Sequence, residues 1–208
     1  MDHRDDEALL DEFRQNRDPA LFKSLLRRFQ NRLFNTVYRT LGNAEEAEEV
    51  VQDTCIKVYQ GIDKFNKNSS FAAWIFRIAH NSCLDVVRIK QRKRNIQFVP
   101  LDAPADPEGG SESPGAVAQA ADPSPGPADL LDHSEQGAVI AEKLAMLPDS
   151  QRTVLVLHDI EGFSYIEISE ITGEAVGTVR SRLHYGRQKM RELLEPYYSS
   201  GAVSRAQR

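Results

Sequence analysis

The stretch from residue 102 to residue 136 limits the possible folds of this 208-residue chain more than any other feature. It contains six prolines, four glycines and eight acidic residues, but no Lys or Arg. Such a composition buries too little apolar surface to offset the entropy lost when a chain becomes ordered. We therefore expect a flexible acidic linker over 101–136 between an N-terminal part (1–100) and a C-terminal part (137–198), followed by a short tail (199–208).

Both parts that flank the linker are predicted to be helical. Apolar residues recur at three- and four-residue spacing, and no segment alternates as a strand would. Asp18-Pro19 is typical of a helix start, Ser164 and Glu167 are spaced as a capping box, and Pro196 is expected to end the last helix. The apolar stripe after Pro19 consists of Phe22, Leu25, Leu26, Phe29, Leu33, Val37 and Leu41. The expected fold class is all-α, with two small helical domains and a helix-turn-helix in the second.

Several classes of protein are excluded by composition. Nowhere do about eighteen apolar residues follow one another, so we expect no membrane insertion, and the N-terminus does not resemble an export signal. The two cysteines, Cys55 and Cys83, form no CxxC pair, which indicates a reducing cytoplasm and no zinc site. No phosphate-binding Gly-rich loop and no metal-ligand spacing occurs, so we expect no enzyme activity, no cofactor and no metal.

The helix predicted over 44–60 has an unusual outer face. Its buried face is predicted to consist of Ala47, Val50, Val51, Thr54, Cys55 and Val58. Opposite to it, Glu45, Glu49, Gln52 and Asp53 surround one outward apolar residue, Ile56. This face is either a solvated acidic surface with a single exposed hydrophobic residue, or a docking surface with Ile56 as its anchor.

The helix predicted over 70–94 carries two sets of residues. Its core stripe is Phe71, Ile75, Ile78, Ser82, Val86 and Ile89, and a second set within about 60° of arc is Trp74, Arg77, Asn81, Arg88 and Arg92. In the second set, Trp can stack on an unpaired base, Asn can bond a base edge and Arg can hold phosphates. The alternative is that Trp74 is a core residue and the arginines are solvated. The loop before this helix, with Asn68, Ser69 and Ser70, either cradles a base or only caps the helix.

The C-terminal part has a helix-turn-helix pattern, with helices over 164–171 and 176–195 and a turn over 172–174. On the second helix, the residues predicted to face inward are Val179, Leu183, Gly186, Met190, Leu193 and Leu194. The residues predicted to face outward are Ser181, His184, Tyr185 and Gln188, with Arg180, Arg182, Arg187 and Lys189 at the flanks. Since the net charge is −5, DNA binding must depend on such local basic faces.

Three segments in this order resemble the extracytoplasmic-function sigma factors, group 4 of the sigma-70 family. They are Ala47-Glu48-Glu49-Val50-Val51-Gln52-Asp53-Thr54, the helix from Phe71 to Asn81, and the region from Leu147 to Leu194 with Glu161-Gly162-Phe163-Ser164-Tyr165. The resemblance covers nearly the whole chain except the linker and the last ten residues. It implies a protein of the bacterial cytoplasm that binds core RNA polymerase and directs it to promoters.

The resemblance also implies roles for individual residues. Contacts with the clamp helices of the largest polymerase subunit are implied for Glu49, Gln52 and Asp53, beside Ile56. Binding of the minus-10 element is implied for Asn68, Ser69, Ser70, Trp74, Arg77, Asn81, Arg88 and Arg92. Binding of the minus-35 element is implied for Thr178, Arg180, Ser181, Arg182, His184, Tyr185 and Gln188. The C-terminal domain is expected to contact the polymerase flap, and an anti-sigma factor is expected as a further partner.

Two other functions stay open on the sequence alone. A stand-alone helix-turn-helix regulator would bind duplex sites without polymerase, usually as a dimer. A helical adaptor would function without DNA, so that neutralising Arg77, Arg88, Arg180 and Arg182 would leave it intact. The chain also departs from the family pattern at His80, Cys55 and Ala175, which leaves the preferred promoter sequence open.

Overall fold

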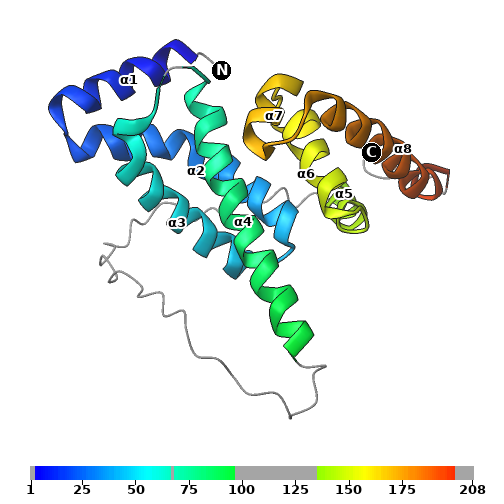
Figure 1. The fold of residues 1–208 in the computed structure, drawn as a ribbon. Coiled ribbons are helices and arrows are strands. Elements are labelled where there is room, and N and C mark those ends of the chain that lie inside the picture. Colours follow the sequence, from blue (N-terminus) through cyan, green and yellow to red (C-terminus); the bar gives the residue numbers. More distant parts are fainter. Residues whose placement is uncertain (1–2, 67, 97–134, 200–208) are drawn as a thin grey trace.

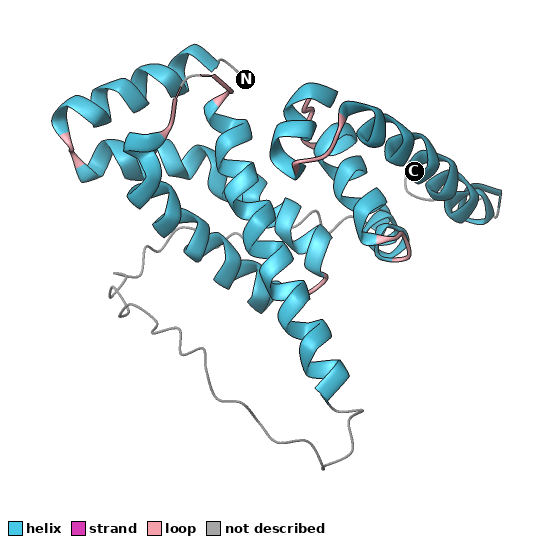
Figure 2. Ribbon diagram, in the orientation of Figure 1, coloured by secondary structure: helices cyan, strands magenta, loops and turns pink. Residues whose placement is uncertain are grey.

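The computed structural model describes residues 3–66, 68–96 and 135–199, in which every regular element is a helix (Figure 1, Figure 2). The first domain consists of α1 (His3–Asn16), α2 (Pro19–Leu41), α3 (Ala44–Gly61), the 3-10 turn η1 (Ile62–Lys64) and α4 (Phe71–Ile96). The second consists of α5 (Glu135–Ala145), α6 (Asp149–Leu155), the π-helical turn η3 (Val156–Ile160), α7 (Tyr165–Thr172) and α8 (Val176–Ser199). The predicted all-α fold is confirmed.

Residues 101–134 of the predicted linker lie outside the described residues, and so does the predicted tail from residue 200. The first helix after the linker, α5, begins at Glu135. The last two residues of the predicted linker, Glu135 and Gln136, thus belong to the first turn of this helix, where a carboxylate is favourable.

Local capping signals account for several helix ends. The side chain of Asp18 accepts a hydrogen bond of 2.8 Å from the Ala20 amide at the start of α2, and Gly42 ends this helix with a φ of +73°. A complete capping box of Ser164 and Glu167 begins α7, as predicted. Pro196 does not end α8, which continues to Ser199. That prediction was wrong because proline removes only one amide donor, and an exposed terminal turn tolerates this loss.

The apolar stripes form one continuous core. The predicted buried faces of α2 and α3 are confirmed, since their residues are buried or pack against the core. The same holds for α8 except at Leu193, which is half-buried and not part of the core. On α4 the prediction for Ile89 was wrong, because its side chain is exposed near the C-terminal end of the helix. Phe76, which the predicted stripe did not include, is completely enclosed.

The two domains pack against each other. Helix α7 lies along α4, and α2 contacts α5, α6 and η3 (Figure 1). These contacts join segments that are far apart in the sequence, such as Arg32 and Glu161, which are 129 residues apart. The two domains are therefore in direct contact, which we call the closed arrangement. In it the helix-turn-helix domain packs against α4, the helix that carries the predicted minus-10 residues.

Candidate polymerase and nucleic-acid interfaces

The outer face of α3 has the arrangement that the sequence predicts. Glu49 and Gln52 are exposed, and Ile56 is 53% exposed although it is apolar. Sequence reasoning missed Tyr59, which is exposed beside Ile56 while its ring contacts Phe22 edge-on at 5.1 Å between centroids. The signal was present, since residues three apart share one helix face. Two adjacent exposed apolar side chains flanked by carboxylates suit a protein partner better than water.

Asp53 has a structural role in addition to any contact with a partner. Its carboxylate accepts a hydrogen bond of 2.9 Å from the buried Ser82 hydroxyl and lies 2.6 Å from the Lys57 ammonium. Because Ser82 belongs to α4, these bonds tie α3 to α4. The half-buried Asp53 therefore holds the outer face of α3 at a fixed place relative to the minus-10 helix.

Trp74 does not lie on an exposed face, and that part of the prediction was wrong. Its side chain is only 8% exposed. The ring packs against Phe65 at 5.3 Å and Phe71 at 5.8 Å between centroids, and it covers Gly61 at the end of α3. Trp74 thus fixes the loop before α4 to the core, which is the alternative that the sequence left open.

The other predicted minus-10 residues on α4 are accessible. Arg77, Asn81, Arg88 and Arg92 are all exposed on one side of the helix. Arg88 forms an exposed ion pair of 3.1 Å with Asp85, a contact of little strength that a phosphate can replace. This side can therefore contact a nucleic-acid backbone, with Asn81 available for a base edge.

The loop before α4 has a mixed character. Asn68 is exposed, whereas Ser69 and Ser70 are half-buried. The Ser70 hydroxyl caps α4 by accepting a hydrogen bond of 3.2 Å from the Ala73 amide. It also donates one of 3.0 Å to the Glu167 carboxylate in α7. The loop is thus a helix cap that the second domain contacts directly.

Helix α8 presents a polar ridge between two basic flanks. The ridge consists of Ser181, His184, Tyr185 and Gln188, all exposed. A rotation of 100° per residue places Arg180, Arg187 and Arg191 on one flank and Thr178, Arg182 and Lys189 on the other. Sequence reasoning missed Arg191, which lines a hollow of about 450 Å³ together with Arg180, His184 and Gln188. Such a helix can enter a major groove with its ridge while its flanks contact phosphates on either side.

Two of the arginines on these flanks are already held by carboxylates. Arg187 is paired with Asp159, and this hydrogen bond raises the pKa of Arg187, so the guanidinium stays charged. Arg182 is paired with Glu174 in the turn of the helix-turn-helix. Glu174 also acts on His80 of α4, whose pKa is lowered mainly by burial, with Glu174 acting in the opposite direction.

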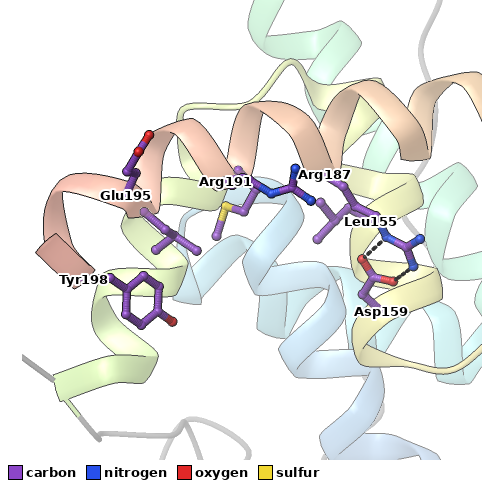
Figure 3. Close-up of a pocket in the computed structure, with 8 residues that line it drawn as sticks. Leu155, Asp159, Arg187, Arg191, Glu195 and Tyr198 are labelled. Atoms are coloured by element: carbon purple, nitrogen blue, oxygen red, sulfur yellow. Dashed lines mark hydrogen bonds and ion pairs between the residues drawn. The ribbon is translucent and has the colours of Figure 1, made fainter.

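An apolar groove runs along α8 next to the flank that carries Arg187 and Arg191 (Figure 3). Its volume is about 690 Å³, and its apolar lining is Leu155, Met190, Leu194 and Tyr198. Charged groups lie at the edge, with the Arg187–Asp159 pair at one end and Glu195 toward the other (Figure 3). A groove of this size and lining fits one face of an amphipathic helix.

Among the described residues, no group of His, Cys, Asp and Glu side chains is arranged to hold a metal ion. None of the helices in this part of the chain has the length and apolar content needed to cross a membrane.

Comparison with known proteins identifies both domains. The family model described as "Sigma-70 region 2" matches residues 25–94, and the model "Sigma-70, region 4" matches residues 138–190. These matches define a protein of the sigma-70 class, with one domain of each kind.

Individual relatives narrow the class to a family. The chain is 36% identical to the "ECF RNA polymerase sigma factor SigW" of Bacillus subtilis, over 85% of this chain and 90% of that protein. It is also 36% identical to the factor SigE of Mycolicibacterium smegmatis, over 86% of this chain and 64% of that protein. A solved structure, the sigma factor RpoE of Bartonella quintana in complex with the anti-sigma factor NepR, matches with a TM-score of 0.61 and 27% identity, over 84% of this chain and 96% of that one. The chain therefore belongs to the ECF, or extracytoplasmic-function, sigma factors of RNA polymerase, which confirms the resemblance.

Proposed function

We propose that this protein binds core RNA polymerase and directs it to promoters through contacts of its two domains with the minus-10 and minus-35 elements. The observation that carries this proposal is the presence, on one chain, of a region 2 and a region 4 domain that each expose a basic polar helix face. A net charge of −5 allows only weak binding to duplex DNA by the isolated protein. Polymerase binding therefore controls promoter recognition.

The outer face of α3 docks on polymerase. Ile56 and Tyr59 supply the apolar anchor, while Glu49, Gln52 and Asp53 meet basic groups on the clamp helices of the largest subunit. Replacing Ile56 with Asp should weaken binding to core polymerase by about tenfold or more, which is the usual effect of losing a central anchor. The matched control is Ile140→Asp, which changes an exposed isoleucine of α5.

The two DNA elements are bound by different helices. The ridge of α8 reads the duplex minus-35 element, and Arg77, Asn81, Arg88 and Arg92 of α4 hold the melted minus-10 strand. Trp74 contributes by fixing the loop from Asn68 to Ser70, in which an unpaired base is captured.

The apolar groove between α6 and α8 is the second polymerase contact. Its lining by Leu155, Met190, Leu194 and Tyr198 suits an apolar helix, and we assign it to the polymerase flap. An anti-sigma factor is a further partner, because the related sigma factor RpoE of Bartonella quintana was solved with one.

Run-off transcription tests the proposal directly. Core polymerase is incubated with a pool of host genomic fragments, with and without the protein. Discrete new transcripts that share two upstream elements support a sigma factor. Specific duplex binding by the protein alone, with no new transcripts, would instead support a stand-alone helix-turn-helix regulator.

A further inference from the structure

The corner between η3 and α7, which consists of Glu161, Gly162 and Phe163, presents two side chains to the first domain. The amide of Glu161 bonds to the Val156 carbonyl at 3.0 Å, which closes the π-helical turn. Gly162 then has a φ of +79°, a conformation that other residues rarely adopt. The ring N–H of His158, on Nδ1, donates to the Phe163 carbonyl at 2.7 Å and fixes the corner from within.

The Glu161 side chain is bound by two side chains of α2, those of Arg32 and Thr36. Its carboxylate accepts hydrogen bonds of 2.9 Å from Arg32 Nε and 2.7 Å from the Thr36 hydroxyl, and its side chain is only 5% exposed. The Glu161 carbonyl also accepts a bond of 3.2 Å from Arg32. The carboxylate is thus matched in both charge and hydrogen bonding by groups of the other domain.

Phe163 completes the contact. Its ring lies edge-on to Phe76 of α4 at 4.9 Å between centroids. The Arg32 guanidinium lies over both rings, 5.3 Å from Phe76 and 5.8 Å from Phe163. Each such contact adds a modest attraction, and together they fix where the aromatic ring and the cation lie.

A second apolar stripe on α4 packs against other parts of the second domain. Ala72, Phe76, Ala79 and Cys83 are buried at helical spacing, outside the stripe that faces the first domain. Between α4, α2 and the second domain only a small cavity of about 20 Å³ remains, lined by Cys83 and, from the second domain, Thr153 and Leu157. Arg152 adds a hydrogen bond of 2.7 Å to the Thr40 carbonyl at the end of α2.

The closed arrangement is incompatible with simultaneous contact with both promoter elements. Elements named minus-10 and minus-35 are about 25 base pairs apart, or roughly 85 Å along straight DNA. Ser70 of the minus-10 loop is bonded to Glu167 of α7, and α8, which starts a few residues later, is only about 36 Å long by its 24 residues. The ridge of α8 therefore lies too close to the loop, and the domains must separate before both elements are bound.

We propose that Arg32, Thr36 and Phe76 form a docking surface for the chain's own Glu161–Gly162–Phe163 corner, an intramolecular latch that keeps the two promoter-binding domains together until polymerase separates them. The role of this latch in transcription rests on the proposed function, whereas the existence of the latch does not depend on it. The ion pair at its centre suits an interface that opens, because Arg32 and Glu161 are both well solvated once they are apart.

Cys83 allows the latch to be tested on the full-length chain without polymerase or DNA. Its thiol is 4% exposed, and burial raises its pKa to about 12, so it is both covered and protonated when the domains are closed. Cys55 lies on α3, away from the second domain, and burial likewise raises its pKa to about 11. Alkylation at the two thiols, measured by peptide mass spectrometry, therefore separates domain opening from unfolding of the first domain.

Two variants from opposite domains should open the latch. Glu161→Gln removes the negative charge that faces Arg32, and Thr36→Val removes a hydrogen bond with little change in shape. We expect alkylation of Cys83 to rise on the order of tenfold in Glu161→Gln and to rise also in Thr36→Val, since bonds to a charged group are involved. Alkylation of Cys55 should not change. The matched control, Glu192→Gln on the exposed side of α8, should leave both thiols as they are in the parent chain.

Two results would overturn the proposal. If Cys83 stays unreactive in both variants, the Glu161 corner does not hold the domains together, whatever the protein does in transcription. If both thiols become reactive, these residues stabilise the fold of the first domain and not the closure. Failure of run-off transcription with normal opening of the latch would refute the proposed function alone.

Discussion

Replacing Trp74 with Ala should act mainly on stability. Loss of a buried Trp typically costs about 3–5 kcal/mol of unfolding free energy, and Trp74 is packed between Phe65 and Phe71. In a domain of about 100 residues each kcal/mol lowers Tm by about 4–8 °C, so the fall should be at least about 12 °C. Asn81→Ala, an exposed change on the same helix, should stay within about 0.5 kcal/mol of the parent while it weakens promoter melting.

The assay is simple because Trp74 is the single tryptophan of the chain. Its fluorescence should be blue-shifted, poorly quenched by acrylamide and unchanged by a single-stranded minus-10 oligonucleotide, and its emission should report unfolding directly. Strong quenching by the oligonucleotide, or a Trp74→Ala variant with the Tm of the parent chain, would refute the argument that Trp74 is a core residue. It would then have to leave the core and stack on a base.

Three further predictions follow from charge and burial. Arg180→Ala should weaken duplex binding by the polymerase complex about equally on all sequences and lower the salt slope by about one, because this exposed arginine on the flank of α8 contacts phosphate; an unchanged slope would contradict this. In the parent chain, Cys55 and Cys83 should resist iodoacetamide up to about pH 9, since burial raises their pKa values to about 11 and about 12; fast alkylation at pH 8 would show that the thiols are accessible. Burial lowers the pKa of His80 against the opposing effect of Glu174, so the closed chain should lose stability as the pH falls below about 6.5, the ordinary pKa of histidine. Small-angle scattering should then show a larger radius of gyration near pH 5.5, and a constant radius of gyration would contradict this.

Features with a local cause could be predicted from the sequence. Helix starts at Asp18 and Ser164 depend on side chains two or three residues from the amides that they cap. The exposed ridge of α8 and the outer face of α3 follow from helical periodicity, because one side of each helix is packed against its own domain and the other is left open. The exposed Ile56 was predicted for the same reason.

Features with a distant cause could not be predicted in this way. The burial of Trp74 depends on Phe65 and on the small Gly61, and neither residue belongs to α4, so a helical-wheel projection of α4 does not include them. The burial of Phe76 depends on Phe163, nearly 90 residues later in the chain. A signal was nevertheless present, since 71–79 has apolar residues at all positions but Arg77. A helix that is apolar on nearly all sides is typically covered on more than one side, which predicts a second partner for α4.

The latch reduces promoter binding by limiting reach and not by covering the DNA-binding faces. In the closed chain the ridge of α8 is exposed, and so are Arg77 and Asn81 on α4. Each domain can therefore contact its own element, but the bond between Ser70 and Glu167 prevents both from doing so on one promoter. Two linked contacts typically bind 10²–10⁴ times more tightly than one, and this gain is lost when geometry forbids their simultaneous use. An interface of modest strength is thus sufficient for control, because polymerase has only to separate the domains for the affinity of the linked contacts to be restored.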